Sequence, residues 1–101
     1  MTHPTRALDD VVHQRARLGI LALLHDAGRA DFAYLRETLD LTDGNLARHL
    51  EVLAAAELVK IAKTFEGKRP RTFVSATPKG RGAFRAEIAA LKMIVERARA
   101  R

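Results

Sequence analysis

The amino-acid sequence predicts a small fold that is mainly α with a small β-hairpin, an α+β arrangement. Three observations lead to this prediction: apolar side chains recur at helical spacing, a β-branched and aromatic stretch is interrupted by Gly and Pro, and a Thr-Pro helix start precedes the last segment. At 101 residues, the chain has the usual size of one domain. We therefore expect residues 1–101 to form a single domain in the order helix, short strand, helix, helix, hairpin, helix.

The first helix is expected over residues 8–26, where apolar side chains recur at helical spacing. The repeating positions are Val12, Ala16, Ile20, Leu23 and Leu24. Gly28 is expected to end this helix, and residues 29–31 are expected to form a very short strand. Asp31 would cap a second helix. The inward positions of that helix are Phe32, Leu35 and Leu39.

A third helix is expected from Thr42, its N-cap, to about Ala56. Leu41 and Leu46 occupy the two positions of a hydrophobic staple around this cap. The positions expected to be buried are Leu46, Leu50 and Leu53. Two helices joined by such a short turn form a helix-turn-helix candidate.

A β-hairpin is expected over residues 58–77, because two stretches rich in β-branched and aromatic residues flank EGKRP. Its tip is basic. Residues 60–81 hold seven basic side chains and one acidic side chain, so this segment accounts for the whole net charge of +6. Such a segment attracts polyanions, nucleic acid first and anionic membrane second. Taken alone, a charge run more often marks a solvated surface.

A long helix is expected over residues 78–101, because Thr77 is an N-cap followed by Pro at the first helical position. Apolar residues then alternate at the spacing of a coiled-coil seam, at Phe84, Ile88, Leu91, Val95 and Ala98. A domain of this size covers one face of such a helix and leaves another for a second copy. We predict a homodimer with an interface that includes Val12, Phe84, Ile88, Leu91, Ile94 and Val95. The alternative is that this face packs on the first helix of the same chain.

The outward side of the third helix is small and singly basic. Arg48 points away from the core, and its neighbours include Gly44 and Asn45. The major groove of B-DNA admits one α-helix, and Arg and Asn suit the edges of guanine and adenine. A helix start also favours phosphate, although the carboxylates of Asp43 and Glu51 oppose it. The Thr42 hydroxyl is at least as well suited to capping the helix as to touching phosphate.

These considerations predict contacts with double-stranded DNA. Asn45, Arg48 and His49 are expected at base edges or nearby phosphates, and Thr42 and Gly44 at the DNA backbone. The hairpin contacts would come from Lys63, Lys68, Arg69 and Arg71, which supply affinity with little sequence information.

The chain also carries a spaced pattern that runs from the third helix into the fourth. It consists of Gly44-Asn45-Leu46, His49-Leu50 and Leu53, then Lys63, Phe65, Gly67, Pro70 and Thr72, then Thr77, Gly80-Arg81 and Ala83-Phe84. This pattern resembles the winged helix-turn-helix DNA-binding domain of small prokaryotic transcriptional regulators of the MarR and ArsR type, most closely a short MarR-like group. The resemblance covers most of the chain, including the segment with His13, Arg17, Leu18 and Ile20.

The resemblance implies a transcriptional regulator that binds DNA as a homodimer, with the third helix in the major groove and the hairpin as the wing. A dimer of this kind can also hold a small-molecule effector between its helices, although no residue identifies one. Members of the group usually have Gly where this chain has Glu57. If that turn requires a left-handed residue, Glu there costs about 1 kcal/mol.

Other chemistry is poorly supported. The chain has no Cys, and its four histidines, at positions 3, 13, 25 and 49, lack the spacing of metal ligands. No Gly-rich phosphate loop or nucleophile motif is present, so we expect neither an enzyme nor a cofactor. No apolar run approaches the roughly 18 residues that span a bilayer, so we expect a cytoplasmic protein without a membrane partner. The alternative functions are a winged-helix protein-interaction module that uses the last helix, and an RNA-binding winged helix.

Overall fold

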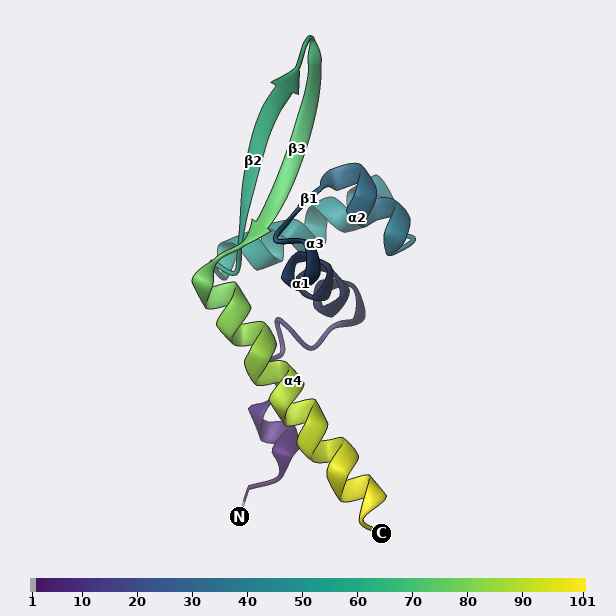
Figure 1. Cartoon of the computed structure of the whole chain (residues 1–101), viewed down its shortest axis with the longest axis vertical. Helices are drawn as coiled ribbons and strands as arrows, with labels where there is room; N and C mark the ends of the chain where they lie inside the picture. The colour runs from purple at the N-terminus through teal and green to yellow at the C-terminus, as the bar shows by residue number, and fades with distance from the viewer. Residues whose placement is uncertain (1) are drawn as a thin grey trace.

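The computed structural model describes residues 2–101 and has the expected order of elements. A short 3₁₀ helix that was not expected, η1 (Pro4–Ala7), precedes the predicted elements. These are α1 (Arg15–Ala27), β1 (Arg29–Asp31), α2 (Phe32–Thr38), α3 (Asp43–Ala55), β2 (Val59–Glu66), β3 (Arg69–Ala76) and α4 (Pro78–Arg99). The hairpin rises from one end of the helical body and α4 extends from the other, so the molecule is elongated, 57 × 24 × 21 Å (Figure 1). The predicted fold class is confirmed.

Each helix begins at a polar cap, as its sequence indicates. Asp31 accepts a hydrogen bond from the backbone N–H of Tyr34, Thr42 from that of Asn45, and Thr77 from that of Gly80. Gly28 ends α1 with a φ of 78°, a conformation that glycine adopts without steric cost. Each of these local bonds satisfies one of the backbone groups that a helix end leaves unpaired.

The start of α1 differs from the expectation. The helix begins at Arg15 rather than near residue 8, because Gln14 is its N-cap and accepts from the backbone N–H of Arg17. The preceding residues form a turn in which Asp9 Oδ1 accepts from the backbone N–H of Val11 at 2.8 Å. Asp9 therefore organises a turn instead of starting a helix. Val12 still points into the core, where it is fully buried.

The three strands form one antiparallel sheet in the order β1-β3-β2. Gly67 and Lys68 connect β2 to β3, and only Gly67 has a positive φ, 62°, the pattern of a type II′ hairpin turn. β1 pairs Ala30 with Val74 of β3, which ties the base of the hairpin to the helical body. Beyond Val59, every residue of β2 is exposed, so most of this strand projects into solvent.

One hydrophobic core joins α1, α2, α3, the base of the sheet and the start of α4. Its fully buried large side chains include Ile20, Leu21, Leu24, Leu35, Leu46, Leu53 and Val74. Gly80 allows α4 to begin against this core, since a Cβ at that position would stand 1.9 Å from the carbonyl oxygen of Leu58. The turn before β2 has Glu57 at a φ of 64°, so the left-handed conformation is present there in a residue other than glycine.

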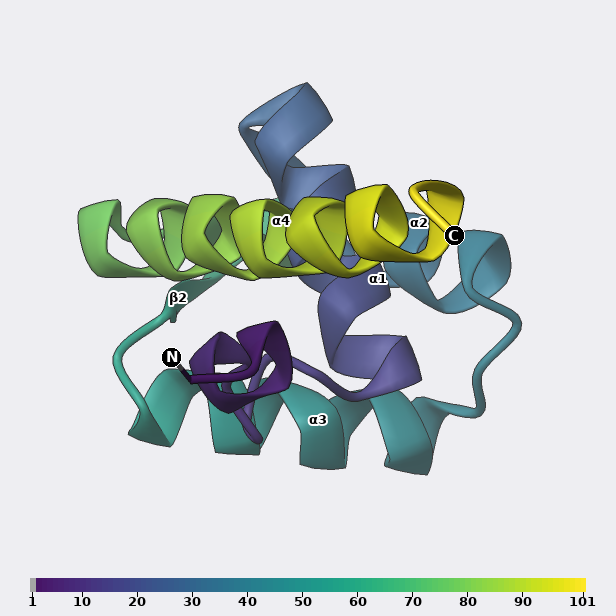
Figure 2. The same ribbon diagram turned by 90° about the horizontal axis from the view of Figure 1, so that it is seen from below.

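The structure corrects the expected dimer surface at two positions. Val12 and Phe84 are buried in the core of the chain itself, at 0% and 9% exposure, so neither offers area to a second chain. Along α4, the inward strip is Phe84, Glu87 and Ala90, whereas Ile88 and Val95 are exposed. The far half of α4 lies beyond the helical body and has η1 beside it (Figures 1 and 2).

Candidate nucleic-acid interface

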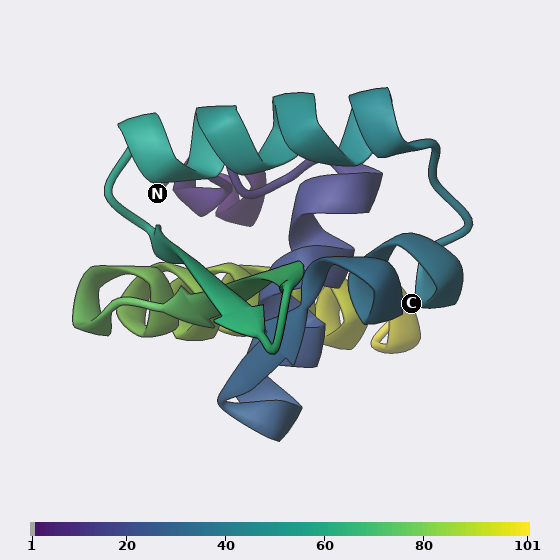
Figure 3. The same cartoon turned by 90° about the horizontal axis from the view of Figure 1, so that it is seen from above.

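α3 lies along one edge of the body, and no other element among residues 2–101 covers its outer side (Figures 2 and 3). Its inner side is held by Leu46, Leu50 and Leu53, which are at most 3% exposed. This arrangement follows from the four-three spacing of the leucines, which places all three on one side of the helix. The opposite side is therefore free to approach a partner.

Asn45 and Arg48 lie together on this free side. Both are exposed, and Arg48 Nη2 donates to Asn45 Oδ1 at 3.1 Å. Gly44 and Ala47 beside them are also exposed, and a Cβ on Gly44 would have no heavy atom within 4 Å. The forked donors of Arg48 and the amide of Asn45 therefore project from a helix whose backbone can come close to a flat or grooved surface.

The start of α3 is engaged by its own cap. The Thr42 hydroxyl accepts from the backbone N–H of Asn45 at 3.1 Å, which is the capping role, although its own proton has no acceptor among residues 2–101. Asp43, whose charge opposes phosphate, forms an ion pair with Arg36 of α2 at 2.7 Å. This pairing reduces the repulsion that the sequence predicts for this carboxylate.

His49 differs from its two neighbours because it is half-buried at the edge of α3. Its Nδ1 atom lies 3.2 Å from Nη1 of Arg17, which comes from α1. Burial, and secondly the positive charges of Arg17 and Arg48, lower the pKa of His49 below its usual value. Both effects favour the neutral form of the His49 imidazole. Arg17 was not among the expected site residues, and its place beside His49 depends on a contact between residues 32 positions apart.

The tip of the wing presents Lys68 and Arg69, which are both exposed. Neither takes part in an ion pair within the part of the chain that the structure describes. Phe65, 70% exposed, lies near them on β2. The tip therefore combines two unpaired cations with one aromatic ring on a narrow projection, well away from the hydrophobic core (Figure 1).

Arg71 has a structural role that the sequence does not reveal. It is half-buried, and its guanidinium forms ion pairs with Asp31 and, at 2.6 Å, with Glu66. The guanidinium also lies over the ring of Phe73, 5.4 Å from its centre. With two carboxylates already bound, Arg71 ties the wing to the start of α2.

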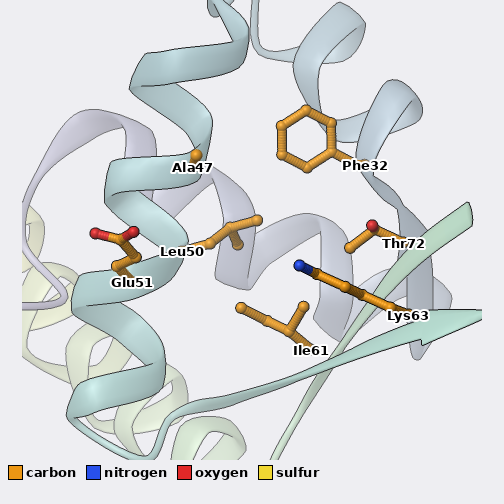
Figure 4. Close-up of a pocket in the computed structure, with 7 residues that line it drawn as sticks. All are labelled: Phe32, Ala47, Leu50, Glu51, Ile61, Lys63 and Thr72. Atoms are coloured by element: carbon orange, nitrogen blue, oxygen red, sulfur yellow. The ribbon is translucent and has the colours of Figure 1, made fainter.

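Lys63 faces α3 and not the tip of the wing. It lines a pocket of about 300 Å³ between α3, α2 and the hairpin, together with Phe32, Ala47, Leu50, Glu51, Ile61 and Thr72. Figure 4 shows the ammonium group of Lys63 directed toward this pocket, with the carboxylate of Glu51 on the opposite side. The pocket separates α3 from the wing, so a strand of phosphates that crossed this gap would pass Lys63.

Glu87 is a second residue whose role the sequence does not reveal. It is 1% exposed on the inward face of α4, one turn after Phe84, and this spacing was the available signal. Among residues 2–101, no three His, Cys, Asp or Glu side chains gather in a way that could hold a metal ion. No helix in this part of the chain has the length and apolar character needed to cross a membrane.

Comparisons with known proteins agree with this architecture. Residues 16–95 match the family described as winged helix DNA-binding domain. An uncharacterized protein of Methanocaldococcus jannaschii is 44% identical over 69 residues, which cover 68% of this chain and 75% of that protein.

Solved structures share the fold. A transcriptional regulator homologue from Pyrococcus horikoshii superimposes with a TM-score of 0.86 at 32% identity, over 95% of this chain and 96% of that one. The transcriptional regulator MosR of Mycobacterium tuberculosis, in complex with DNA, gives a TM-score of 0.73 at 20% identity, over 96% of this chain and 69% of that one. Because the family matches most of its length, the chain belongs to the winged helix DNA-binding domain family.

Proposed function

We propose that this protein is a transcriptional regulator that binds duplex DNA as a homodimer, without catalysis. α3 enters the major groove, where Asn45 and Arg48 contact base edges or nearby phosphates. Thr42 and Gly44 approach the DNA backbone, and Lys63, Lys68 and Arg69 bind phosphates from the wing. The cytoplasm is the expected location of such a regulator.

The observation that carries the proposal is the exposed pair of Asn45 and Arg48 on a helix with small neighbours. Arg and Asn are the side chains whose donors and acceptors match guanine and adenine edges. Gly44 and Ala47 remove the bulk that would keep the helix backbone away from the groove. The same fold in MosR has been crystallised with DNA, which supports a nucleic-acid partner for this arrangement.

The dimer part of the proposal depends on α4. Ile88 and Val95 are 44% and 53% exposed and lie two helical turns apart, so they continue one apolar strip along the helix. Leu91 and Ile94, both half-buried, border this strip. In a symmetric dimer formed there, the two copies of α3 would read a near-palindromic site with half-sites about 34 Å apart.

The test begins with selection of bound sequences from random duplex DNA at a stated salt concentration. Arg48→Ala should lose discrimination between selected and random DNA, because it removes the donors proposed to read a base. The double variant Lys68→Ala with Arg69→Ala should weaken binding to selected and random DNA alike. The slope of its log binding constant against log salt concentration should fall by about 2, about 1 for each lost phosphate contact. Arg85→Ala, which removes an exposed charge from α4, is the matched control.

Equal binding and equal discrimination by all variants would overturn the assignment of these residues to the DNA interface. Binding that is negligible or insensitive to salt in the unmodified protein would favour the protein-interaction module. Preference for structured RNA over duplex DNA would favour the RNA-binding function.

A further inference from the structure

The bonding of Arg17 determines which nitrogen of His49 carries the proton. A guanidinium group only donates hydrogen bonds, so Nδ1 of His49, 3.2 Å from Arg17 Nη1, must accept. An accepting Nδ1 requires a neutral imidazole with its proton on Nε2. Within residues 2–101, Nε2 of His49 has no hydrogen-bond partner, so its N–H is available to another molecule.

Arg17 is itself held in place from the other side. Its Nε donates to the carbonyl oxygen of Val11 at 2.6 Å, and its Nη2 lies 3.5 Å from that of Asp10. Both carbonyls belong to the turn that precedes α1. A guanidinium bonded through three nitrogens in this way has a fixed direction, whereas the three donors of a lysine share one nitrogen and rotate freely.

The turn that holds Arg17 is fastened to α4. The buried carboxylate of Glu87 accepts from the backbone N–H of Asp9 at 3.2 Å, and its other oxygen lies 2.6 Å from Nδ1 of His13. A carboxylate accepts, so Nδ1 of His13 must carry a proton. Nδ1 is therefore protonated in His13 and unprotonated in His49. Through these residues, a chain of polar contacts connects α4 to α3.

We propose that Arg17 is a positioning residue for DNA recognition, which holds His49 neutral with its proton on Nε2, so that α3 offers DNA a donor without a positive charge. This inference rests on the proposed function for its DNA part. A neutral N–H suits an acceptor on a base edge. Loss of this N–H contact should lower the affinity for DNA without changing the number of counterions that DNA releases on binding. Loss of a lysine or arginine contact to phosphate does change this number, because each neutralised phosphate steepens the dependence of the binding constant on salt concentration.

The first experiment needs no DNA. Nitrogen NMR of the imidazole rings at pH 7.5 should show His49 with a bare Nδ1 and a protonated Nε2, and His13 with a protonated Nδ1. Arg17→Lys keeps the charge but loses the rigid guanidinium that donates to Nδ1 of His49. His49 should therefore become a mixture of tautomers, while His13 stays unchanged. Arg15→Lys, an exposed position in the same helix, should alter neither ring. A protonated Nδ1 on His49 in the unmodified protein, or an unchanged His49 in Arg17→Lys, would overturn the inference.

The second experiment uses the duplex selected by the unmodified protein. Arg17→Lys should weaken binding about tenfold, which corresponds to about 1.4 kcal/mol, and the salt slope should stay the same. In a His49→Ala background, the same substitution should have almost no further effect. If the losses in affinity caused by Arg17→Lys and by His49→Ala multiply in the double variant, Arg17 acts on DNA directly and the positioning role is wrong. If the unmodified protein binds no DNA, the proposed function fails, and the NMR result still decides the state of His49.

Discussion

Nδ1 of His13 lies 2.6 Å from Oε2 of Glu87, and this pair joins the segment before α1 to the inner face of α4. The Glu87 side chain is completely inaccessible, whereas that of His13 is 48% exposed. The carboxylate therefore depends on His13 and on the backbone N–H of Asp9, while His13 retains access to water. The two residues are 74 positions apart, so the pair forms only when the chain is folded.

His13→Ala should destabilise the protein by about 1–3 kcal/mol, because it leaves a buried carboxylate short of a donor. The midpoint of urea unfolding measures this loss. In a Glu87→Leu background, the same substitution should cost much less, since no buried charge remains. An equal cost in both backgrounds would show that His13 stabilises the protein by another route.

Gly80→Ala should destabilise the protein by about 1–3 kcal/mol, because the new Cβ would overlap a carbonyl oxygen that cannot easily move. That oxygen belongs to Leu58 and accepts a hydrogen bond from the backbone N–H of Thr77 at 3.0 Å. Gly82→Ala is the matched control, since a Cβ there would meet no heavy atom within 4 Å. This control should stabilise the helix by about 1 kcal/mol. The midpoint of thermal unfolding measures both changes. An unchanged midpoint for Gly80→Ala would contradict the prediction.

Asp31→Asn should flatten the acid side of the pH–stability profile. A hydrogen bond from the backbone N–H of Tyr34, and then the contact with Arg71, hold the pKa of Asp31 below its usual value. A carboxyl whose pKa is lower in the folded state stabilises above its unfolded pKa of about 3.9, and this contribution disappears as the pH falls through the folded value. Urea unfolding between pH 7 and pH 2 measures the difference.

Arg71→Gln provides the comparison for Asp31. It should flatten the same acid region only partly, because the bond from Tyr34 remains. An Asp31→Asn profile as steep as that of the unmodified protein would mean that Asp31 contributes no acid-dependent stability.

Ile88→Glu should convert the proposed dimer into a monomer in sedimentation experiments. Ile88 is 44% exposed, so the charge can be placed there without disturbing the core of the protomer. Met93→Glu tests the other flank of α4, where Met93 is 54% exposed. It should leave the mass unchanged if the partner packs on the strip of Ile88 and Val95. A monomer from Met93→Glu alone would move the interface to that flank.

The sequence by itself determined where most helices begin and end and where the hairpin turns. Asp31, Thr42 and Thr77 each bond a backbone N–H three residues ahead, so their caps depend on neighbours in the chain. Gly28 and Gly67 act through their own φ angles. The leucine spacing of α3 likewise showed which side of that helix would be exposed, and the structure places Arg48 there.

Only the tertiary structure decided the roles that depend on distant partners. Arg71 carries the same charge as Lys68 in the sequence, yet it is bound by Asp31, which lies 40 positions away. α1 begins at Arg15, later than the sequence predicts, because Asp9 organises the turn before it and Glu87 anchors that turn. Spacing along the chain marks which side chains can share a face of a helix. Which carboxylate, carbonyl or ring then meets a given side chain is determined by the packing of segments that the sequence keeps far apart.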